Sequence, residues 1–294
     1  MLSKARYRSG GALFSYLPPS YIPHMSTPQI LGVVNITADS FSDGGQFLQT
    51  EAALGQARKL VRDGAHILDL GAAASNPKAD VVPLVEEIAR LQPVIATLQE
   101  EGIALSIDTF SPEVQLWCLS QGVAYLNDIH GFAHPEIYPQ LADSETKLIV
   151  MHAVQTEGRA TTVDIPPEDI FQRVVDFFSV RIDAFERAGV AKTRLILDPG
   201  MGMFLGRRSE ASYEMLRRFP ELKRMFGLPV LIGVSRKSFL RQGRPPGEAG
   251  PATLAAELFA SSLGADYIRT HDAATLRDGL AVWIAAIGRN TTSI

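Results

Sequence analysis

Residues 30–45 read ILGVVNITADSFSDGG, and this stretch decides the expected fold. Its first five residues form a continuous apolar run after Pro28, which is typical of a parallel strand buried on both faces. The run stops at Asn35, and hydroxyls, carboxylates and glycines follow it. Such a mixture predicts a mobile loop after a fixed strand end. An ordinary strand-to-helix connection fits this one loop equally well, so the other strands must decide.

Outward from this stretch, short β-rich apolar runs alternate with longer amphipathic segments, which indicates repeated βα units. The predicted strands are 30–35, 66–71, 104–109, 124–128, 148–152, 195–198, 230–235 and 267–271. The predicted helices are 51–63, 81–101, 112–121, 136–143, 168–189, 210–225, 251–263 and 273–287. Eight units in about 260 residues predict an α/β fold, a (β/α)8 TIM barrel. A doubly wound open sheet is the alternative, although no strand is followed by the glycine-rich phosphate loop common in that class.

The barrel is expected to form a single domain over residues 29–294, preceded by a flexible extension at residues 1–28. The apolar piece at residues 12–17 is too short for a transmembrane span. A net charge of −4 and a pI near 5.9 argue against nucleic acid or an anionic membrane as partner. The single cysteine, Cys118, cannot form an internal disulfide and has no zinc-type spacing around it, which fits a reducing cytoplasm.

Nearly every predicted strand ends in a polar or charged residue. These residues are Asn35, Asp69, Asp108, Asn127 with Asp128, His152, Asp198, Ser235 with Arg236 and Lys237, and Arg269 with His271. Any one of them could be a solvated loop residue or a helix cap. In a barrel all the carboxyl ends of the strands lie on one face, where active sites are built. Together they predict one site.

The residue types sort into two chemistries. Asp108, Asn127 and Asp198 suit the N–H edge of a flat heterocycle, which a carboxylate can hold with two parallel hydrogen bonds. Asn35, Arg269 and His271 are suited to an anion or a metal, and the run Ser235 to Ser238 adds positive charge. The pattern therefore predicts a substrate with a donor-rich ring at one end and a phosphate-type anion at the other.

The chain resembles the dihydropteroate synthase family from about Gln29 to Ile287. The motifs that carry the resemblance are GVVNITADSFSDGG from Gly32, SIDT from Ser106, LNDI from Leu126, VMH from Val150, LDPGMG from Leu197, SRKS from Ser235 and RTH from Arg269. The resemblance implies a TIM barrel that condenses 6-hydroxymethyl-7,8-dihydropterin pyrophosphate with p-aminobenzoate. It also implies a homodimer.

The resemblance also implies a role for each matching residue. The residues in contact with the pterin would be Asp108, Asn127, Met151, Asp198 and Lys237. The residues in contact with the pyrophosphate would be Asn35, Arg269 and His271, and Asn35 would also bind Mg²⁺. The contacts with p-aminobenzoate would be Phe41, Ser75, Pro77, Phe204, Arg236 and Ser238. Catalysis would rest on Asp108, Asp198, Lys237, Arg269 and His271, which stabilise a ring cation and a departing anion together.

Two loops depart from the family pattern. Where the family has GESTRPGA, this chain has AAASNPKA at residues 72–79, so Asn76 replaces an arginine. After the LDPGMG motif, the usual Phe-Gly-Lys becomes MFLGR at residues 203–207. Both changes resemble the sulfonamide-resistant, Sul-type branch. The alternatives are a pterin-binding methyltransferase barrel and a non-catalytic pterin-binding module.

Overall fold

A computed structural model of the chain describes residues 27–36, 45–73, 82–154, 163–241, 243–245 and 248–287. The strands are β1 (Gln29–Asn35), β2 (Ile67–Gly71), β3 (Ala104–Asp108), β4 (Tyr125–Asp128), β5 (Lys147–Met151), β6 (Leu195–Asp198), β7 (Leu231–Ile232) and β8 (Tyr267–Thr270). The α-helices are α1 (Gly45–Arg62), α2 (Leu84–Glu100), α3 (Pro112–Ser120), α4 (Tyr138–Ala142), α5 (Pro167–Arg187), α6 (Ser209–Phe226), α7 (Ser238–Arg241), α8 (Gly250–Ser262) and α9 (Ala273–Ala286).

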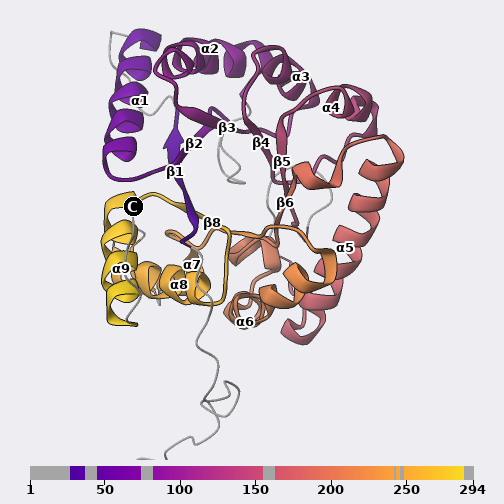
Figure 1. The fold of residues 1–294 in the computed structure, drawn as a ribbon, viewed down its shortest axis with the longest axis vertical. Helices are drawn as coiled ribbons and strands as arrows, with labels where there is room; N and C mark the ends of the chain where they lie inside the picture. The colour runs from indigo at the N-terminus through magenta and orange to yellow at the C-terminus, as the bar shows by residue number, and fades with distance from the viewer. Residues whose placement is uncertain are drawn as a thin grey trace, which may run out of the picture.

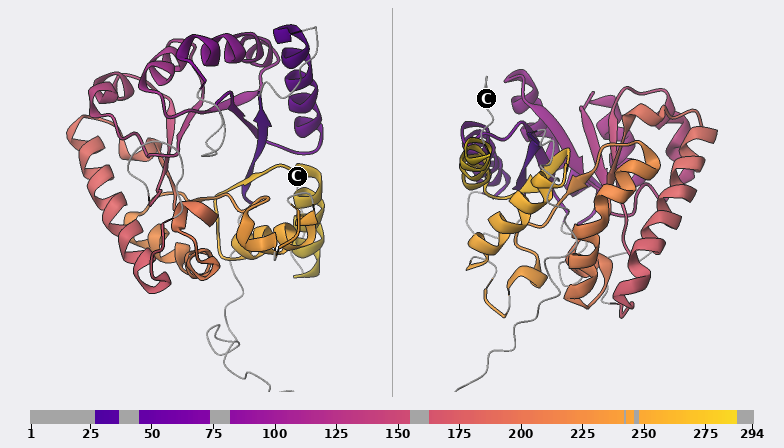
Figure 2. Two further views of the ribbon diagram at one scale, coloured as in Figure 1. Left: turned by 180° about the vertical axis from the view of Figure 1, so that it is seen from behind. Right: turned by 60° about the horizontal axis from the view of Figure 1, so that its bottom comes forward.

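The eight strands form one parallel sheet in the order β6-β5-β4-β3-β2-β1-β8-β7. A parallel bridge between Leu197 and Val230, and a hydrogen bond from Leu197 N to Pro229 O at 2.9 Å, join β6 to β7. The helices surround the strands as an outer ring (Figures 1 and 2). The predicted TIM barrel is therefore confirmed. The alternative of an open doubly wound sheet is wrong, because β6 and β7, the two ends of the strand order, are joined to each other.

The barrel interior is built in layers because alternate residues of each strand point inward. One layer is apolar and consists of Leu31, Ile67, Ile149, Ile196 and Leu231, packed with Ala104, Tyr125 and Tyr267. Two residues further along their strands come Val33, Asp69, Ser106, Asn127, Met151, Asp198, Gly233 and Arg269. The strand alternation thus stacks a layer rich in polar side chains directly on an apolar floor.

The helices bury their apolar faces against the outside of the barrel. Helix α5 is an example, because Ile170, Val174, Phe178 and Phe185 recur at helical spacing and are all buried. His66 precedes β2, away from the carboxyl ends of the strands, and its Nδ1 accepts a hydrogen bond from Ile30 N at 3.0 Å, which is a structural role. No helix among the described residues combines the length and apolar character needed to cross a membrane.

The largest departure from the predicted elements is at β7, which has two residues instead of six. The chain leaves the sheet there because Arg236 adopts a left-handed φ of 61° and Lys237 N closes a turn onto Val234 O at 3.1 Å. The short helix α7, which the sequence pattern does not predict, follows at once. Since residues 1–26 are not among those described, the domain boundary at residue 28 stays a prediction.

Candidate active site

A small cavity opens among the carboxyl ends of the strands, where the sequence predicted the site. It encloses about 50 Å³. Its lining consists of Asp108, Asn127, Ile129, Met151, Asp198, Gly200, Met201, Phe204, Gly233, Lys237 and Arg269. All five residues predicted to hold a pterin ring are among them. This volume is smaller than that of the pockets in which small molecules usually bind.

Arg269 joins two carboxylates, Asp69 and Asp108, which belong to the neighbouring strands β2 and β3. Its Nε donates to Asp69 Oδ2 at 2.5 Å, and its Nη2 donates to Asp108 Oδ2 at 2.7 Å. Asp69 is fully buried and also accepts from Asn127 Nδ2 at 3.2 Å. The third nitrogen of the guanidinium, Nη1, makes no hydrogen bond with any residue that the structure describes, so it can donate to a ligand. Residues 69, 108, 127 and 269 thus form one network across four strands.

Burial shifts the ionisation of the groups that line the cavity. It raises the pKa of Asp108 to about 7, although the positive charge of Arg269 opposes the shift. Burial also raises the pKa of Asp198 to about 6, against a hydrogen bond of 2.8 Å from Gly200 N to its Oδ1. Burial and the neighbouring Arg269 lower the pKa of Lys237 to about 8. All three groups titrate near neutrality, as is common at catalytic sites.

An apolar wall faces these charges. Phe204 packs with Ile129 and Met151, and the Nζ atom of Lys237 lies 4.6 Å from the centre of its ring. Phe204 belongs to a 3-10 turn, η3 (Gly202–Leu205), and its carbonyl oxygen accepts from Val154 N at 3.0 Å. Its packing partners therefore belong to strand ends and loops at the mouth of the barrel.

The loop before η3 depends on glycine. Gly200 has a φ of +74°, and a Cβ atom there would lie 2.4 Å from the carbonyl oxygen of His152. Gly202 has a φ of +67°, and its N–H donates to the buried hydroxyl of Ser212 at 2.9 Å. The backbone therefore passes close to the end of β5, and α6 anchors it through Ser212.

His271 and Ser235 form a pair at the end of β8. Ser235 Oγ lies 3.2 Å from His271 N and 3.0 Å from His271 Nδ1. Because Oγ accepts the backbone N–H and has no other acceptor among the described residues, its own proton points to Nδ1. The ring proton is then on Nε2. Burial and the positive charges of Arg236, Arg269 and Lys237 lower the pKa of His271 to about 3, so the ring is neutral.

Asn35 is exposed at the end of β1, as a ligand to a metal at the barrel mouth would need to be. A Cβ atom on Gly71 would lie 3.9 Å from Asn35 Oδ1 and 4.0 Å from Asp108 Oδ2, so both oxygens border the same space. Among the described residues no group of three His, Cys, Asp or Glu side chains could hold a metal. One amide oxygen fits Mg²⁺ only as a partial ligand, with substrate phosphates and water completing the shell.

Comparison with known proteins places this geometry in a family. The model of the family described as "Pterin binding enzyme" matches residues 31–271. The chain belongs to this family. The type-2 dihydropteroate synthase of Escherichia coli is 55% identical over 258 residues, covering 87% of this chain and 95% of the relative. The type-3 enzyme of the same organism is 53% identical, covering 86% of this chain and 97% of that enzyme.

A solved structure gives the same result. Dihydropteroate synthase from Xanthomonas albilineans in complex with 7,8-dihydropteroate superposes with a TM-score of 0.77 at 35% identity. The match covers 90% of this chain and 95% of that chain. The resemblance to dihydropteroate synthases is therefore confirmed, and the relatives are transferases. The methyltransferase alternative has no support among these relatives.

The remaining predicted contacts lie outside the cavity or outside the described residues. Arg236 is exposed in the turn before α7 and Ser238 is exposed at the first position of α7, on either side of Lys237. Phe41, Ser75 and Pro77 lie outside the residues that the structure describes, and so does Asn76. The role in p-aminobenzoate binding stays a prediction for all of these residues and for Phe204.

Two strand-end residues were grouped with the site wrongly. The carboxylate of Asp128 accepts from His130 N at 2.7 Å, Phe132 N at 3.0 Å and Gln115 Nε2 at 2.7 Å, so it stabilises the loop after β4. His152 Nδ1 lies 3.2 Å from Pro199 O, and its ring packs edge-on against Phe177. Each follows an inward-facing residue, Asn127 or Met151, and strand alternation turns it outward.

Asp69 is the residue that the sequence analysis left without a role. It was noted only as a polar strand end. Alternation along β2 could have placed it, because Ile67 belongs to the apolar floor and Asp69 is two residues further on.

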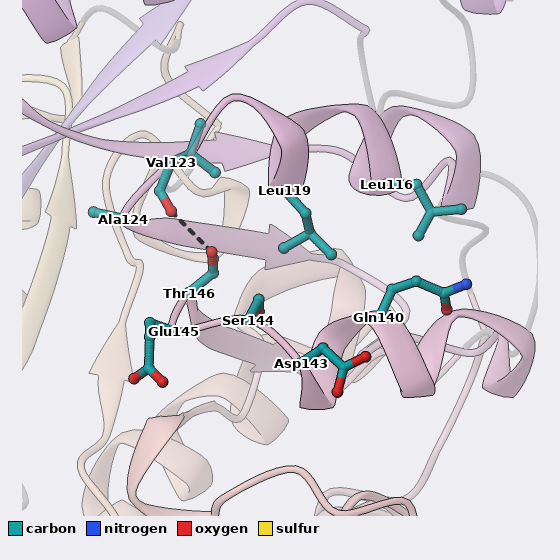
Figure 3. A pocket seen from close by; sticks show the side chains of 10 residues that line it. Leu116, Leu119, Val123, Ala124, Gln140, Asp143, Ser144, Glu145 and Thr146 are labelled. Atoms are coloured by element: carbon teal, nitrogen blue, oxygen red, sulfur yellow. Dashed lines mark hydrogen bonds between the residues drawn. The ribbon is translucent and has the colours of Figure 1, made fainter.

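A larger hollow of about 570 Å³ lies elsewhere, on the outside of the barrel (Figure 3). Its lining comes from α3, α4 and the segments that lead into β4 and β5, including Leu116, Leu119, Gln140 and Asp143. The hydroxyl of Thr146 donates there to Val123 O at 2.9 Å. This hollow is at the amino ends of the strands and shares no residue with the cavity at the carboxyl ends.

Proposed function

We propose that the chain catalyses the condensation of 6-hydroxymethyl-7,8-dihydropterin pyrophosphate with p-aminobenzoate to give 7,8-dihydropteroate and pyrophosphate, as part of folate biosynthesis. The observation that carries this proposal is the cavity at the strand ends, where Asp198, Asn127 and Lys237 converge beside Asp108 and Arg269. The dihydropteroate bound to the Xanthomonas enzyme contains both halves of the proposed product.

The proposed pterin contacts follow from hydrogen-bonding capacity. Asp198 Oδ2 and Asn127 Oδ1 can accept from ring N–H groups, whereas the Lys237 ammonium donates to a ring carbonyl or nitrogen. Phe204, Ile129 and Met151 supply an apolar surface for the flat ring. A neutral pterin therefore finds both polarities and a stacking surface.

The charged side chains in and beside the cavity favour a cationic ring. Departure of pyrophosphate breaks the C–O bond at the pterin methylene and leaves positive charge delocalised into the ring. When fully ionised, Asp69, Asp108 and Asp198 carry three negative charges against two positive charges on Lys237 and Arg269, a balance of −1. The amine of p-aminobenzoate then forms the new C–N bond and loses its proton to water. We propose that these five charged side chains together stabilise that cation.

The pyrophosphate is assigned to His271, Arg269 and Asn35. The neutral His271 ring offers an Nε2–H donor, and Arg269 offers its Nη1 group, which no described residue engages. Bound Mg²⁺, held by Asn35 and phosphate oxygens, would supply further charge for the leaving group. The protein groups orient the anion, since none of them is required to transfer a proton.

We further propose that the enzyme is insensitive to sulfonamides. A sulfonamide replaces the flat carboxylate of p-aminobenzoate with a bulkier tetrahedral group. Phe204, in a loop that departs from the usual family form, is buried and held by Lys237 and by the hydrogen bond to Val154. A fixed aromatic side chain can exclude the larger ligand while admitting the smaller one.

The proposed assembly is a homodimer in the cytoplasm. Four large apolar side chains on or directly after α8 and α9 are exposed in the isolated chain: Phe259, Val282, Trp283 and Ile287. Exposed apolar patches of this kind mark interaction sites. The free thiol of the buried Cys118 fits a reducing compartment.

The direct test is formation of 7,8-dihydropteroate from the dihydropterin pyrophosphate and labelled p-aminobenzoate, with and without Mg²⁺. We expect one pyrophosphate released for each product molecule, and loss of turnover on chelation of the metal. Calorimetry with pyrophosphate and Mg²⁺ should show that each strengthens binding of the other. A protein that binds the pterin but forms no product would be a non-catalytic pterin-binding module, contrary to the proposal.

A further inference from the structure

We propose that Asp69 is a positioning residue of the pterin site, which fixes the amide of Asn127 so that its oxygen faces the ligand. This inference rests on the proposed pterin cavity and adds a residue to it. Asp69 does not line the cavity, so its effect on a ligand is transmitted through Asn127 and Arg269.

The first step is the role of Asp69 as a hydrogen-bond acceptor. Its side chain is fully buried, and Arg269 Nε lies 2.5 Å from its Oδ2 atom. A guanidinium can only donate hydrogen bonds, so Oδ2 accepts this one. The ion pair with Arg269 thereby fixes the Asp69 oxygens in place inside the barrel.

The second step is the orientation of the amide. Asn127 is 97% buried, and one end of its amide lies 3.2 Å from Asp69 Oδ2. That end must be the NH2 group, since an amide oxygen there would face a second acceptor. The opposite end is then the oxygen Oδ1, which is buried and has no hydrogen-bond partner among the described residues. A buried acceptor without a partner is unfavourable unless a ligand donates to it.

The third step is selectivity. With the amide fixed, the cavity presents Asn127 Oδ1 and the carboxylate of Asp198 as acceptors. An unrestrained amide could rotate to present either a donor or an acceptor, and would discriminate poorly between ligands. Asp69 thus makes this side of the site selective for the N–H groups of a ring.

The experiment exchanges the two residues. The single variants are Asp69→Asn and Asn127→Asp, and the double variant Asp69→Asn/Asn127→Asp restores one amide and one carboxylate at this contact. In the double variant the amide at position 69 donates to the carboxylate at position 127 and accepts from Arg269. The other oxygen at position 127 still faces the cavity. The variant Asp183→Asn, at an exposed position on α5, is the matched control.

Calorimetry with 6-hydroxymethylpterin, which lacks the pyrophosphate, is the main measurement. We expect each single variant to bind it at least about tenfold more weakly, and the double variant to recover to within about threefold of the parent. Steady-state kinetics should show the same recovery in KM for the dihydropterin pyrophosphate. Thermal unfolding of every variant separates loss of the fold from loss of binding.

The outcomes distinguish this inference from the function on which it rests. Unchanged pterin affinity in both Asn127→Asp and Asn127→Ala would overturn the proposed pterin site itself. Weakened affinity in Asn127→Ala, with normal affinity in Asp69→Asn, would overturn only the role of Asp69. A folded double variant that fails to recover pterin affinity would also contradict the role of Asp69. If Asp69→Asn alone does not fold, the double variant tests that role.

Discussion

At the residue scale, the hydroxyl of Ser235 determines which nitrogen of His271 can donate a hydrogen bond. Its Nδ1 atom is engaged by Ser235 Oγ at 3.0 Å, so only Nε2 can donate to an anion. In His271→Gln the amide nitrogen can occupy the place of Nε2, whereas in His271→Asn it reaches only the place of Nδ1. We expect turnover to be about tenfold higher in His271→Gln than in His271→Asn. This factor corresponds to the free energy of one hydrogen bond to a charged group.

The measurement is kcat and KM for both variants beside binding of 6-hydroxymethylpterin. Binding of this ligand should stay near the parent value, because it has no pyrophosphate for His271 to contact. Equal turnover in the two variants would show that the donor position of the ring does not matter.

Asp198 is the residue whose ionisation should limit pterin binding at low pH. Its pKa of about 6, raised by burial, means that the carboxylate forms as pH rises through 6, and affinity should increase with it. Asp108, with a pKa of about 7, adds to the same rise, and Lys237 loses its charge above about 8. Affinity should therefore pass through a maximum between these values.

In Asp198→Asn we expect a loss of about 1–3 kcal/mol in pterin binding at neutral pH and a flatter rise between pH 5 and 7. Comparing the variant with the parent at each pH removes the titration of the ligand itself. Asp183→Asn, at an exposed position, is the control. A variant that keeps the full affinity and slope of the parent would refute the assignment of Asp198.

At the scale of elements, the turn after β6 is held by a close approach that tolerates only glycine. In Gly200→Ala the new Cβ atom would lie 2.4 Å from His152 O in a left-handed conformation. Gly264 has a similar φ of +89°, but nothing lies within 4 Å of a Cβ there. We expect Gly264→Ala to lose about 1 kcal/mol of unfolding free energy from φ alone, and Gly200→Ala to lose about 3 kcal/mol or more. Denaturant unfolding of both variants checks the difference, and equal losses would show that the turn relaxes freely.

The loop at residues 203–207 is the element that we expect to set inhibitor selectivity. Its replacement with the family's Phe-Gly-Lys should lower the Ki of sulfamethoxazole by about a hundredfold, equivalent to roughly 3 kcal/mol. The KM of p-aminobenzoate should change little, because the smaller ligand does not need the extra space. Competition assays on the parent and the shortened loop give both constants. The proposal fails if the parent is already sensitive or if the ratio of Ki to KM does not move.

For the whole molecule, the apolar surface on α8 and α9 predicts self-association. Val282 on α9 is 71% exposed and lies beside Trp283. Val282→Asp would place a charge in a dimer interface at this surface, so we expect the dimer to dissociate into monomers. Val180→Asp, at a position on α5 that is 70% exposed, is the matched control. Sedimentation velocity should separate the two variants, and a dimer that persists in Val282→Asp would place the interface elsewhere.

The sequence by itself determined the barrel and the face that carries the site. Continuous apolar runs such as ILGVV predict parallel strands whatever surrounds them, and the polar residue after each run marks the carboxyl end. Those signals are local, and for this reason the strands other than β7 were predicted closely. Strand β7 was overestimated because the left-handed turn at Arg236 depends on tertiary contacts and not on the apolar run before it.

Only the tertiary structure decided which polar strand ends belong to the site. Asn127 faces the cavity and Asp128 faces away because adjacent residues of a strand point to opposite sides, and the barrel fixes which side is inside. The network of Asp69, Asn127 and Arg269 could not be predicted either, since β2 and β8 contribute residues 200 positions apart in the sequence. Hydrogen bonds of this kind depend on distances of a few tenths of an ångström between strands, and closure of the barrel sets those distances.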